Sequence, residues 1–463
     1  MRAPTQPGRH PRPGPRGDPE MSVLDSLRYH VGANIIGSGV LRWQRILLER
    51  KLANPNWWKH QHIAPPLLSS GRLKELISHH YLKGKFAPGH KKVAWISSGA
   101  PMEFLVALGY FPHYPENHGA MCGIRRISEE LSDVAEGAGW SRDICSYART
   151  DFGAMLSNKG PAGSLPRPDL LLCCTNICQT VLYWYKALAH HFDVPLIVID
   201  TPFLYGEARQ RDLDYTKAQI EEAIATAERV AGRSLDPRDF DATTRLSKQA
   251  TDLWKAIIES ARHRPAPITA FDQFICMAPI VEMRGEAFTV DFYGTVLDEL
   301  NERKKKGIGA VKNERHRLVW DNLPIWFRIK WLAELLAERG VAMVASTYTN
   351  AWGELADLVD VSNPLESAAR VHLHPILNRG TGHKLALITD MVSRFEADGV
   401  ILHSDRSCKP YSIGQVDQTD RINKSTGAAA LLLEADHNDP RAFSEGPVRT
   451  RLEAFLELLE DAA

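Results

Sequence analysis

The chain has 463 residues, of which 44% are hydrophobic and 24% are charged. These values are typical of a globular protein and argue against wholesale disorder or a fibrous structure. Its 56 basic and 56 acidic residues give a formal net charge of zero, so no long-range field favours nucleic acid as a partner. Because no apolar run approaches the ~20 residues of a membrane span, we expect a soluble protein with no membrane partner.

The first twenty residues differ in composition from the rest of the chain. Between Met1 and Glu20 there are six prolines, three glycines and four arginines. Such a segment has too little apolar surface to offset the entropy of ordering, so we expect residues 1–20 to be disordered. The segment lacks the apolar core of a secretory signal, and Met21 offers an alternative start of the chain.

The next seventy residues, 21–90, have an irregular helical pattern and predict an N-terminal helical region. From residue 91 strands and helices alternate, which predicts a first α/β domain over 91–263. The expected strands and helices of this domain are, in order, strand 93–96, helices 103–108 and 127–138, strand 169–174, helix 180–191, strand 195–200, and two long charged helices at 212–230 and 242–262.

Pro265 and Pro267 interrupt the chain, and a second alternating region predicts another α/β domain over 264–463. Its expected elements are helix 288–306, strand 317–320, helix 325–339, strand 341–346, helix 383–397, strands 399–403 and 428–434, and helix 448–460. Strands alternating with helices favour parallel pairing through right-handed crossovers. We therefore predict two similar Rossmann- or flavodoxin-like parallel-sheet domains.

The chain contains seven cysteines, which are too few and too scattered for a disulfide scaffold. An odd number without a secretory leader indicates a reducing compartment, so we expect a cytoplasmic protein with free thiols. The cysteines are residues 122, 145, 173, 174, 178, 276 and 408.

Two of these cysteines occupy matching places in the two halves. Each half contains an acidic residue, an apolar strand, a turn with a cysteine, a helix and another strand; the cysteines are Cys178 and Cys408. Ligands of open α/β sheets bind beyond the carboxyl ends of the strands. This repeated position predicts a ligand shared between the two domains.

Several common sites are absent from the sequence. It has no phosphate-binding loop of the type G-x-x-x-x-G-K-[ST], no G-x-S-x-G elbow, and no paired cysteines of a zinc ribbon. Cys145 begins a segment of small and polar residues, and with Cys178 and Cys408 it would supply three thiolates. Three soft ligands suit zinc or an iron–sulfur cluster, and in a cubane of four irons they leave one iron open.

Three segments resemble the benzoyl-CoA reductase and 2-hydroxyacyl-CoA dehydratase superfamily. They are Cys145-Ser-Tyr-Ala-Arg-Thr-Asp-Phe-Gly153, Cys178 after its apolar strand, and Ala397-Asp-Gly-Val-Ile-Leu-His-Ser-Asp-Arg-Ser-Cys408. The resemblance extends over nearly the whole chain after Met21 and includes segments 265–271 and 316–349. The separations of 33 residues between the first two cysteines and 230 between the last two are similar to the family pattern for three cluster ligands.

The resemblance implies a function and a set of partners. Within the superfamily the chain looks closest to a cluster-bearing catalytic subunit of ATP-dependent benzoyl-CoA reductase, with a [4Fe-4S] cluster held by Cys145, Cys178 and Cys408. Such a subunit would pair with a homologous second catalytic subunit. ATP-hydrolysing activator subunits would deliver electrons from ferredoxin, and benzoyl-CoA or a close aromatic acyl-CoA would be reduced to a cyclic diene. The first alternative is a 2-hydroxyacyl-CoA dehydratase subunit.

Two further alternatives concern the metal site. A homodimeric reductase with a double-cubane cluster would need additional ligands, for which Cys122 is the best candidate, although a buried thiol is an equal interpretation. Cys173 and Cys276 are expected to pack as small hydrophobic residues, and Cys174 receives no role. A zinc-stabilised scaffold without enzymatic activity is disfavoured, because zinc ligands are usually close together in sequence.

Overall fold

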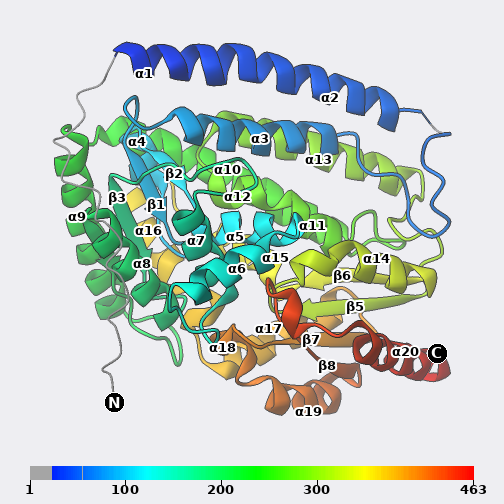
Figure 1. Ribbon diagram of the computed structural model, residues 1–463. Helices are drawn as coiled ribbons and strands as arrows, with labels where there is room; N and C mark the ends of the chain where they lie inside the picture. Colours follow the sequence, from blue (N-terminus) through cyan, green and yellow to red (C-terminus); the bar gives the residue numbers. More distant parts are fainter. Residues whose placement is uncertain (1–22, 55, 463) are drawn as a thin grey trace, which may run out of the picture.

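The structure is a computed structural model that describes residues 23–54 and 56–462. The extension predicted at residues 1–20 and the alternative start at Met21 lie outside the described residues. Two parallel sheets surrounded by helices make up the α/β fold that the sequence predicts (Figure 1).

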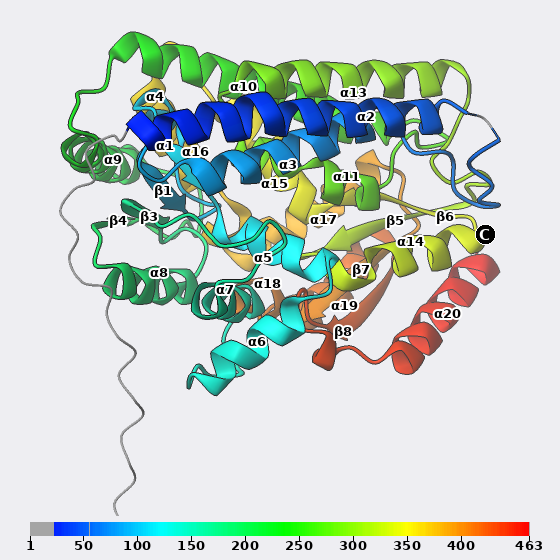
Figure 2. The same cartoon turned by 45° about the horizontal axis from the view of Figure 1, so that its top comes forward.

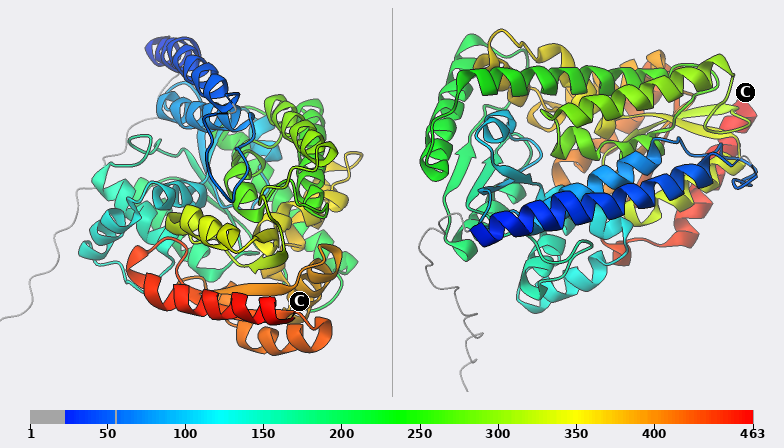
Figure 3. Two further views of the ribbon diagram at one scale, coloured as in Figure 1. Left: turned by 90° about the vertical axis from the view of Figure 1, so that its right-hand side faces the viewer. Right: turned by 90° about the horizontal axis from the view of Figure 1, so that it is seen from above.

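The N-terminal region is helical, as predicted. Helix α1 (Val23–Arg28), the π-helix η1 (Tyr29–Gly37) and α2 (Ser38–Leu52) follow one another as one long helix on the outside of the molecule (Figures 1 and 3). This long helix packs on α3 (Ser70–Phe86), which connects it to the rest of the fold.

The first sheet has the strand order β2-β1-β3-β4, and all its pairs are parallel. Its strands are β1 (Val93–Ile96), β2 (Phe111–His113), β3 (Leu170–Cys174) and β4 (Leu196–Ile199). Every side chain of β1 and β3 is buried, which explains their continuous apolar sequences. The helices of this part are α4 (Glu103–Ala107), α5 (Pro115–Ile124), α6 (Ser128–Gly137), α7 (Ser146–Ser157) and α8 (Gln179–Phe192).

A helical connection separates the two sheets along the chain. The long helices α10 and α13 pack against each other in Figure 2. The connection comprises α9 (Gln210–Ala231), α10 (Pro237–Ser260), α11 (Ala270–Cys276), α12 (Ala278–Glu282) and α13 (Ala287–Lys305).

The second sheet repeats the topology of the first, with the order β6-β5-β7-β8 and parallel pairs throughout. Its strands are β5 (His316–Asp321), β6 (Val341–Ser346), β7 (Gly399–Asp405) and β8 (Ala429–Ala435). Its helices are η2 (Trp326–Arg328), α14 (Ile329–Glu338), α15 (Thr347–Glu354), η3 (Leu355–Leu358), α16 (Pro364–Leu373), η4 (Ile376–Asn378), α17 (Thr381–Arg394), α18 (Lys409–Ser412), α19 (Gln415–Thr426), η5 (Pro440–Ala442) and α20 (Glu445–Ala462).

The two sheets share one continuous apolar core. Trp95 of β1 and Trp320 of β5 are fully buried at equivalent strands of the two sheets. Each indole N–H donates to a backbone carbonyl, that of Pro166 and that of Leu323 respectively. Among the described helices, none combines the length and apolar character needed to cross a membrane.

Candidate functional site

The three predicted cysteines each lie immediately before a helix. Cys145 precedes α7, Cys178 precedes α8 and Cys408 precedes α18. The Cys178 sulfur accepts a hydrogen bond from the backbone N–H of Val181, at 3.5 Å. For Cys178, this contact places the sulfur against the backbone N–H groups that are unpaired at the start of α8.

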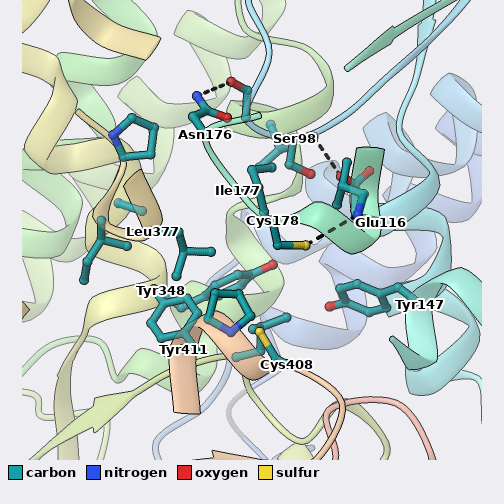
Figure 4. A pocket seen from close by; sticks show the side chains of 18 of the residues that line it. Ser98, Glu116, Tyr147, Asn176, Ile177, Cys178, Tyr348, Leu377, Cys408 and Tyr411 are labelled. Carbon is teal, nitrogen blue, oxygen red and sulfur yellow. Dashed lines mark hydrogen bonds between the residues drawn. The ribbon is translucent and has the colours of Figure 1, made fainter. Parts of the chain in front are cut away.

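The structure brings all three cysteines to one cavity of about 170 Å³. Figure 4 shows the Cys178 and Cys408 side chains among those that line it. Cys178 follows β3 and Cys408 follows β7, so the cavity lies where the carboxyl ends of the two sheets meet. The thiols are half-buried rather than sealed in the core.

The spacing of the three thiols bears on which metal they suit. Two sulfur ligands of one zinc ion, with bonds of about 2.3 Å, lie roughly 4 Å apart. Within the described part of the chain, the one trio of metal-ligating side chains whose donor atoms all come within 4.8 Å is Asp405, Asp436 and His437. The three thiols do not all lie within this distance of one another in the metal-free chain.

Two of the thiols, Cys178 and Cys408, have raised pKa values in the metal-free chain. Burial, together with the neighbouring Cys145 thiol, raises the pKa of Cys178 to about 11. Burial and the carboxylate of Asp405 raise the pKa of Cys408 further above its usual value. Since a bound cation favours the thiolate, metal binding at this site would release protons.

A buried polar network adjoins Cys145. The His437 ring places Nδ1 2.7 Å from Asp405 Oδ2, and Nε2 lies 2.9 Å from Ser146 Oγ and 3.9 Å from Cys145 Sγ. The Ser146 hydroxyl donates to Asp436 at 2.7 Å. Burial opposes the charged imidazole, but the two carboxylates outweigh it and hold the pKa of His437 well above its usual value. The network therefore presents a cation beside the Cys145 sulfur.

A carboxyl group also faces the cavity. Glu116, near the start of α5, accepts a hydrogen bond at Oε1 from the backbone N–H of Ser98, at 3.0 Å (Figure 4). Its other oxygen, Oε2, is buried without a hydrogen bond from the described residues. Burial raises the pKa of Glu116 to about 7. The group can therefore take up or release a proton near neutral pH.

The remaining wall of the cavity is largely apolar and aromatic. Such a lining excludes water and strengthens the electrostatic interactions inside. The apolar and aromatic side chains of the wall belong to Tyr147, Ile177, Val181, Trp184, Met277, Val281, Leu323, Tyr348, Ala351, Trp352, Leu355, Pro375, Ile376, Leu377, Pro410 and Tyr411.

The other cysteines lie apart from this cavity. Cys122 is fully buried in α5, where it packs with Leu131 and Ala154, and its sulfur lies 3.8 Å from His118 Nε2. It is not among the residues that line the cavity. Cys173 and Cys276 are buried among apolar side chains, as predicted, and Cys174 is also buried.

Sequence reasoning did not find Ser98, Glu116 or His437. Ser98 and His437 each lie two residues beyond a strand, β1 and β8 respectively, at the same edge as Cys178 and Cys408. A usable signal is the polar run Asp436-His437-Asn438-Asp439 directly after an apolar strand. Glu116 gives no such signal, since it lies within a helix.

These features define an α/β protein with a cysteine-lined cavity between two parallel sheets. The family model of the 2-hydroxyglutaryl-CoA dehydratase D-component matches residues 97–459. The chain therefore belongs to this family.

Three relatives illustrate the range of enzymes to which this chain is similar. The alpha subunit of (R)-2-hydroxyisocaproyl-CoA dehydratase from Clostridioides difficile is 33% identical over 84% of this chain and 95% of the relative. The alpha subunit of (R)-phenyllactyl-CoA dehydratase from Clostridium sporogenes is 29% identical, with coverages of 80% and 90%. A subunit of benzoyl-CoA reductase from Thauera aromatica is 30% identical, with coverages of 84% and 93%.

Proposed function

We propose that the chain is the cluster-bearing subunit of a 2-hydroxyacyl-CoA dehydratase. Most of the similar proteins found carry dehydratase names, among them those that act on hydroxyisocaproyl-CoA, lactoyl-CoA and phenyllactyl-CoA. The observation that carries the proposal is the convergence of Cys145, Cys178 and Cys408 on one apolar cavity that also holds the Glu116 carboxyl group. The proposal places the dehydratase ahead of the reductase, whereas the sequence alone favoured the reductase.

The three cysteines are the proposed ligands of a [4Fe-4S] cluster. When bound, such a cluster would supply single electrons and one iron without a protein thiolate. A bound cluster would hold the three cysteines as thiolates, and the apolar wall keeps water from a reactive substrate.

Glu116 is the proposed proton-transfer group. The backbone N–H of Ser98 fixes one carboxyl oxygen, and Oε2 accepts no hydrogen bond from the described residues. Loss of water from a 2-hydroxyacyl thioester requires a proton to leave the carbon chain and another to reach the departing hydroxyl group. A carboxyl group with a pKa of about 7 can serve either transfer at neutral pH.

A reductase of the benzoyl-CoA type is the second candidate. It is supported by the 30% identity with the benzoyl-CoA reductase subunit and by the aromatic side chains of the cavity. The same cysteines and the same apolar wall would serve both reactions.

Both candidates act in assemblies. The similar proteins are named as single subunits of larger enzymes, most of them as alpha subunits, which implies a partner subunit for this chain. We extend the proposal to a homologous second subunit and to a separate ATP-hydrolysing activator that takes electrons from ferredoxin.

The test is to count electrons against product. The complex is purified anaerobically with its partner subunit and activator and is then supplied with either substrate class. Many turnovers of a 2-hydroxyacyl-CoA after one priming electron support the dehydratase. Two electrons consumed per dearomatised product, with no dehydration, would instead support the reductase. No reaction with either class overturns both.

A further inference from the structure

We propose that the acyl group accepted at this site is neutral and apolar, branched or aromatic rather than dicarboxylic. The inference rests on the proposed function and adds the substrate class. The similar proteins include enzymes named for both kinds of acyl group, hydroxyisocaproyl and hydroxyglutaryl, so family membership alone does not choose between them.

The first observation is the charge of the cavity wall. Among the described residues that line the cavity there is no Lys and no Arg. The polar side chains on the wall, besides the cysteines and tyrosines, are Ser98, Glu116, Asn117, Asn176, His372 and His437. A second carboxylate on a substrate would therefore meet no guanidinium or ammonium group, and it would share the cavity with the acidic Glu116.

A buried guanidinium group in a neighbouring cavity, that of Arg284, is already paired with a carboxylate. Arg284 is only 3% exposed and lies in a neighbouring cavity, where its Nε donates to Glu103 Oε1 at 2.9 Å. Its guanidinium group also stacks 4.4 Å from the ring centre of Trp352, and Trp352 lines both cavities. Pairing with a substrate carboxylate would require Arg284 to leave Glu103 unpaired in a buried site, which is costly.

The two histidines on the wall do not offer a free cation either. His437 is paired with Asp405 and lies near a second buried carboxylate, that of Asp436. His372 places Nδ1 2.9 Å from the carbonyl oxygen of Gly99, and burial lowers its pKa to about 4, so its ring is neutral at physiological pH.

The second observation is the direction in which the cavity continues. An adjoining cavity of about 100 Å³ shares Asn117, Met277, Val281 and Tyr348 with the first. Its remaining wall is again mainly apolar and aromatic and includes Ile77, Phe274 and Trp326; its one acidic group is Glu282, which accepts a hydrogen bond from Tyr81. An acyl chain that passes Met277 and Val281 thus enters a second apolar space, which suits a branched or aromatic group.

The test compares two unreactive thioesters of similar length, 4-methylpentanoyl-CoA and glutaryl-CoA. Their binding is measured by calorimetry on the anaerobically purified complex. Since a carboxylate buried without a partner is strongly disfavoured, we expect the neutral thioester to bind on the order of 100-fold more tightly. Equal binding of the two would overturn the inference while leaving the proposed function intact. Binding of neither would count against the proposed function itself.

A variant that adds a positive charge to the cavity wall provides a second test. Met277→Arg puts a guanidinium group on the wall shared by the two cavities and should reduce the preference for the neutral thioester by about 10-fold or more. Leu458→Arg, which adds the same charge at an exposed position of α20, is the matched control and should leave the preference unchanged. If Met277→Arg does not fold, Val281→Lys tests the same wall. An unchanged preference in a folded wall variant would contradict the inference.

Discussion

Ser146 and Ser407 hydrogen-bond to each other, with their hydroxyl oxygens 3.2 Å apart. The backbone N–H of Ser146 also donates to the Ser407 hydroxyl oxygen at 3.2 Å. Ser146 directly follows Cys145, and Ser407 directly precedes Cys408. Two proposed ligands from segments far apart in the sequence are therefore joined through their neighbours, which fixes their separation before any metal binds.

The first prediction concerns the three proposed ligands. Replacing Cys145, Cys178 or Cys408 with Ser should lower the iron and sulfide bound per chain to less than half of the parent value, because each thiolate holds one corner of the cluster. Iron and sulfide analysis of anaerobically purified protein measures the effect, and the visible absorption of the cluster should fall in parallel.

Cys122 supplies the matched control for these variants. Its thiol is fully buried beside His118 and does not line the cavity, and Ser can keep the contact with the imidazole. Cys122→Ser should therefore retain the iron content of the parent. Full iron in all three ligand variants would refute the assignment, whereas iron loss in Cys122→Ser would favour an additional ligand and a larger cluster.

The second prediction concerns the cation beside Cys145. His437→Gln removes the positive charge that lies 3.9 Å from the Cys145 sulfur and leaves the carboxylates of Asp405 and Asp436 in place. Because positive charge near a cluster stabilises its reduced form, the reduction potential should fall by about 60 mV, equivalent to about 1.4 kcal/mol for one electron. Redox titration followed by electron paramagnetic resonance measures the shift.

His316 provides the comparison for this variant. It is also a buried histidine near a carboxylate, with Nδ1 3.8 Å from Asp398, but it lies at the start of β5 and does not line the cavity. His316→Gln should leave the potential unchanged. A potential that stays constant in His437→Gln, with iron content preserved, would show that the imidazole does not act on the cluster.

Much of the fold follows from local sequence patterns. The strands predicted at 93–96 and 341–346 coincide with β1 and β6, because short, fully buried apolar runs between helices leave little ambiguity. The edge strand β2 is not predicted, since its three residues, Phe-Pro-His, give no alternating pattern and contain a proline. The pattern over 325–339 predicts one helix, but the segment begins with the 3-10 turn η2.

The site was only partly predictable, for a different reason. Cys178 and Cys408 share a repeated local pattern that sequence comparison of the two halves reveals. Glu116 and His437 reach the cavity only through the packing of α5 and the end of β8, which depends on contacts between residues hundreds of positions apart. For His437, the polar run after β8 is a local signal, whereas no local pattern indicates Glu116.

The third prediction concerns nucleotide chemistry. The sequence has no phosphate-binding loop, and the proposed assembly places ATP hydrolysis on a separate activator. The purified single chain should therefore neither hydrolyse ATP nor convert an acyl-CoA, while addition of the partner subunit and activator should restore turnover. Steady release of phosphate by the single chain, abolished by a substitution within it, would contradict this division of labour.

The last prediction concerns the Glu116 carboxyl group and the stability of the iron-free protein. Its pKa is about 7 in the folded chain against an ordinary value of 4.5, because the group is buried. Between these values the folded chain holds a proton that the unfolded chain has lost, so the free energy of unfolding falls as pH rises from about 5 to about 7. The contribution amounts to about 3 kcal/mol at most. Glu116→Gln cannot ionise and should flatten this part of the pH dependence, measured by chemical denaturation under anaerobic conditions.

The Glu282→Gln variant provides the comparison, because Glu282 is a second buried acid with a raised pKa. It is also buried, with its carboxyl group hydrogen-bonded by Tyr81, and burial raises its pKa to about 8. Glu282→Gln should therefore flatten the curve up to about one pH unit higher than Glu116→Gln does. Glu116→Gln should in addition lower turnover by about 100-fold or more, because Glu116 lines the cysteine cavity. A Glu116→Gln variant with the parent's pH dependence of stability and full turnover would show that the carboxyl group is neither held neutral nor used in proton transfer.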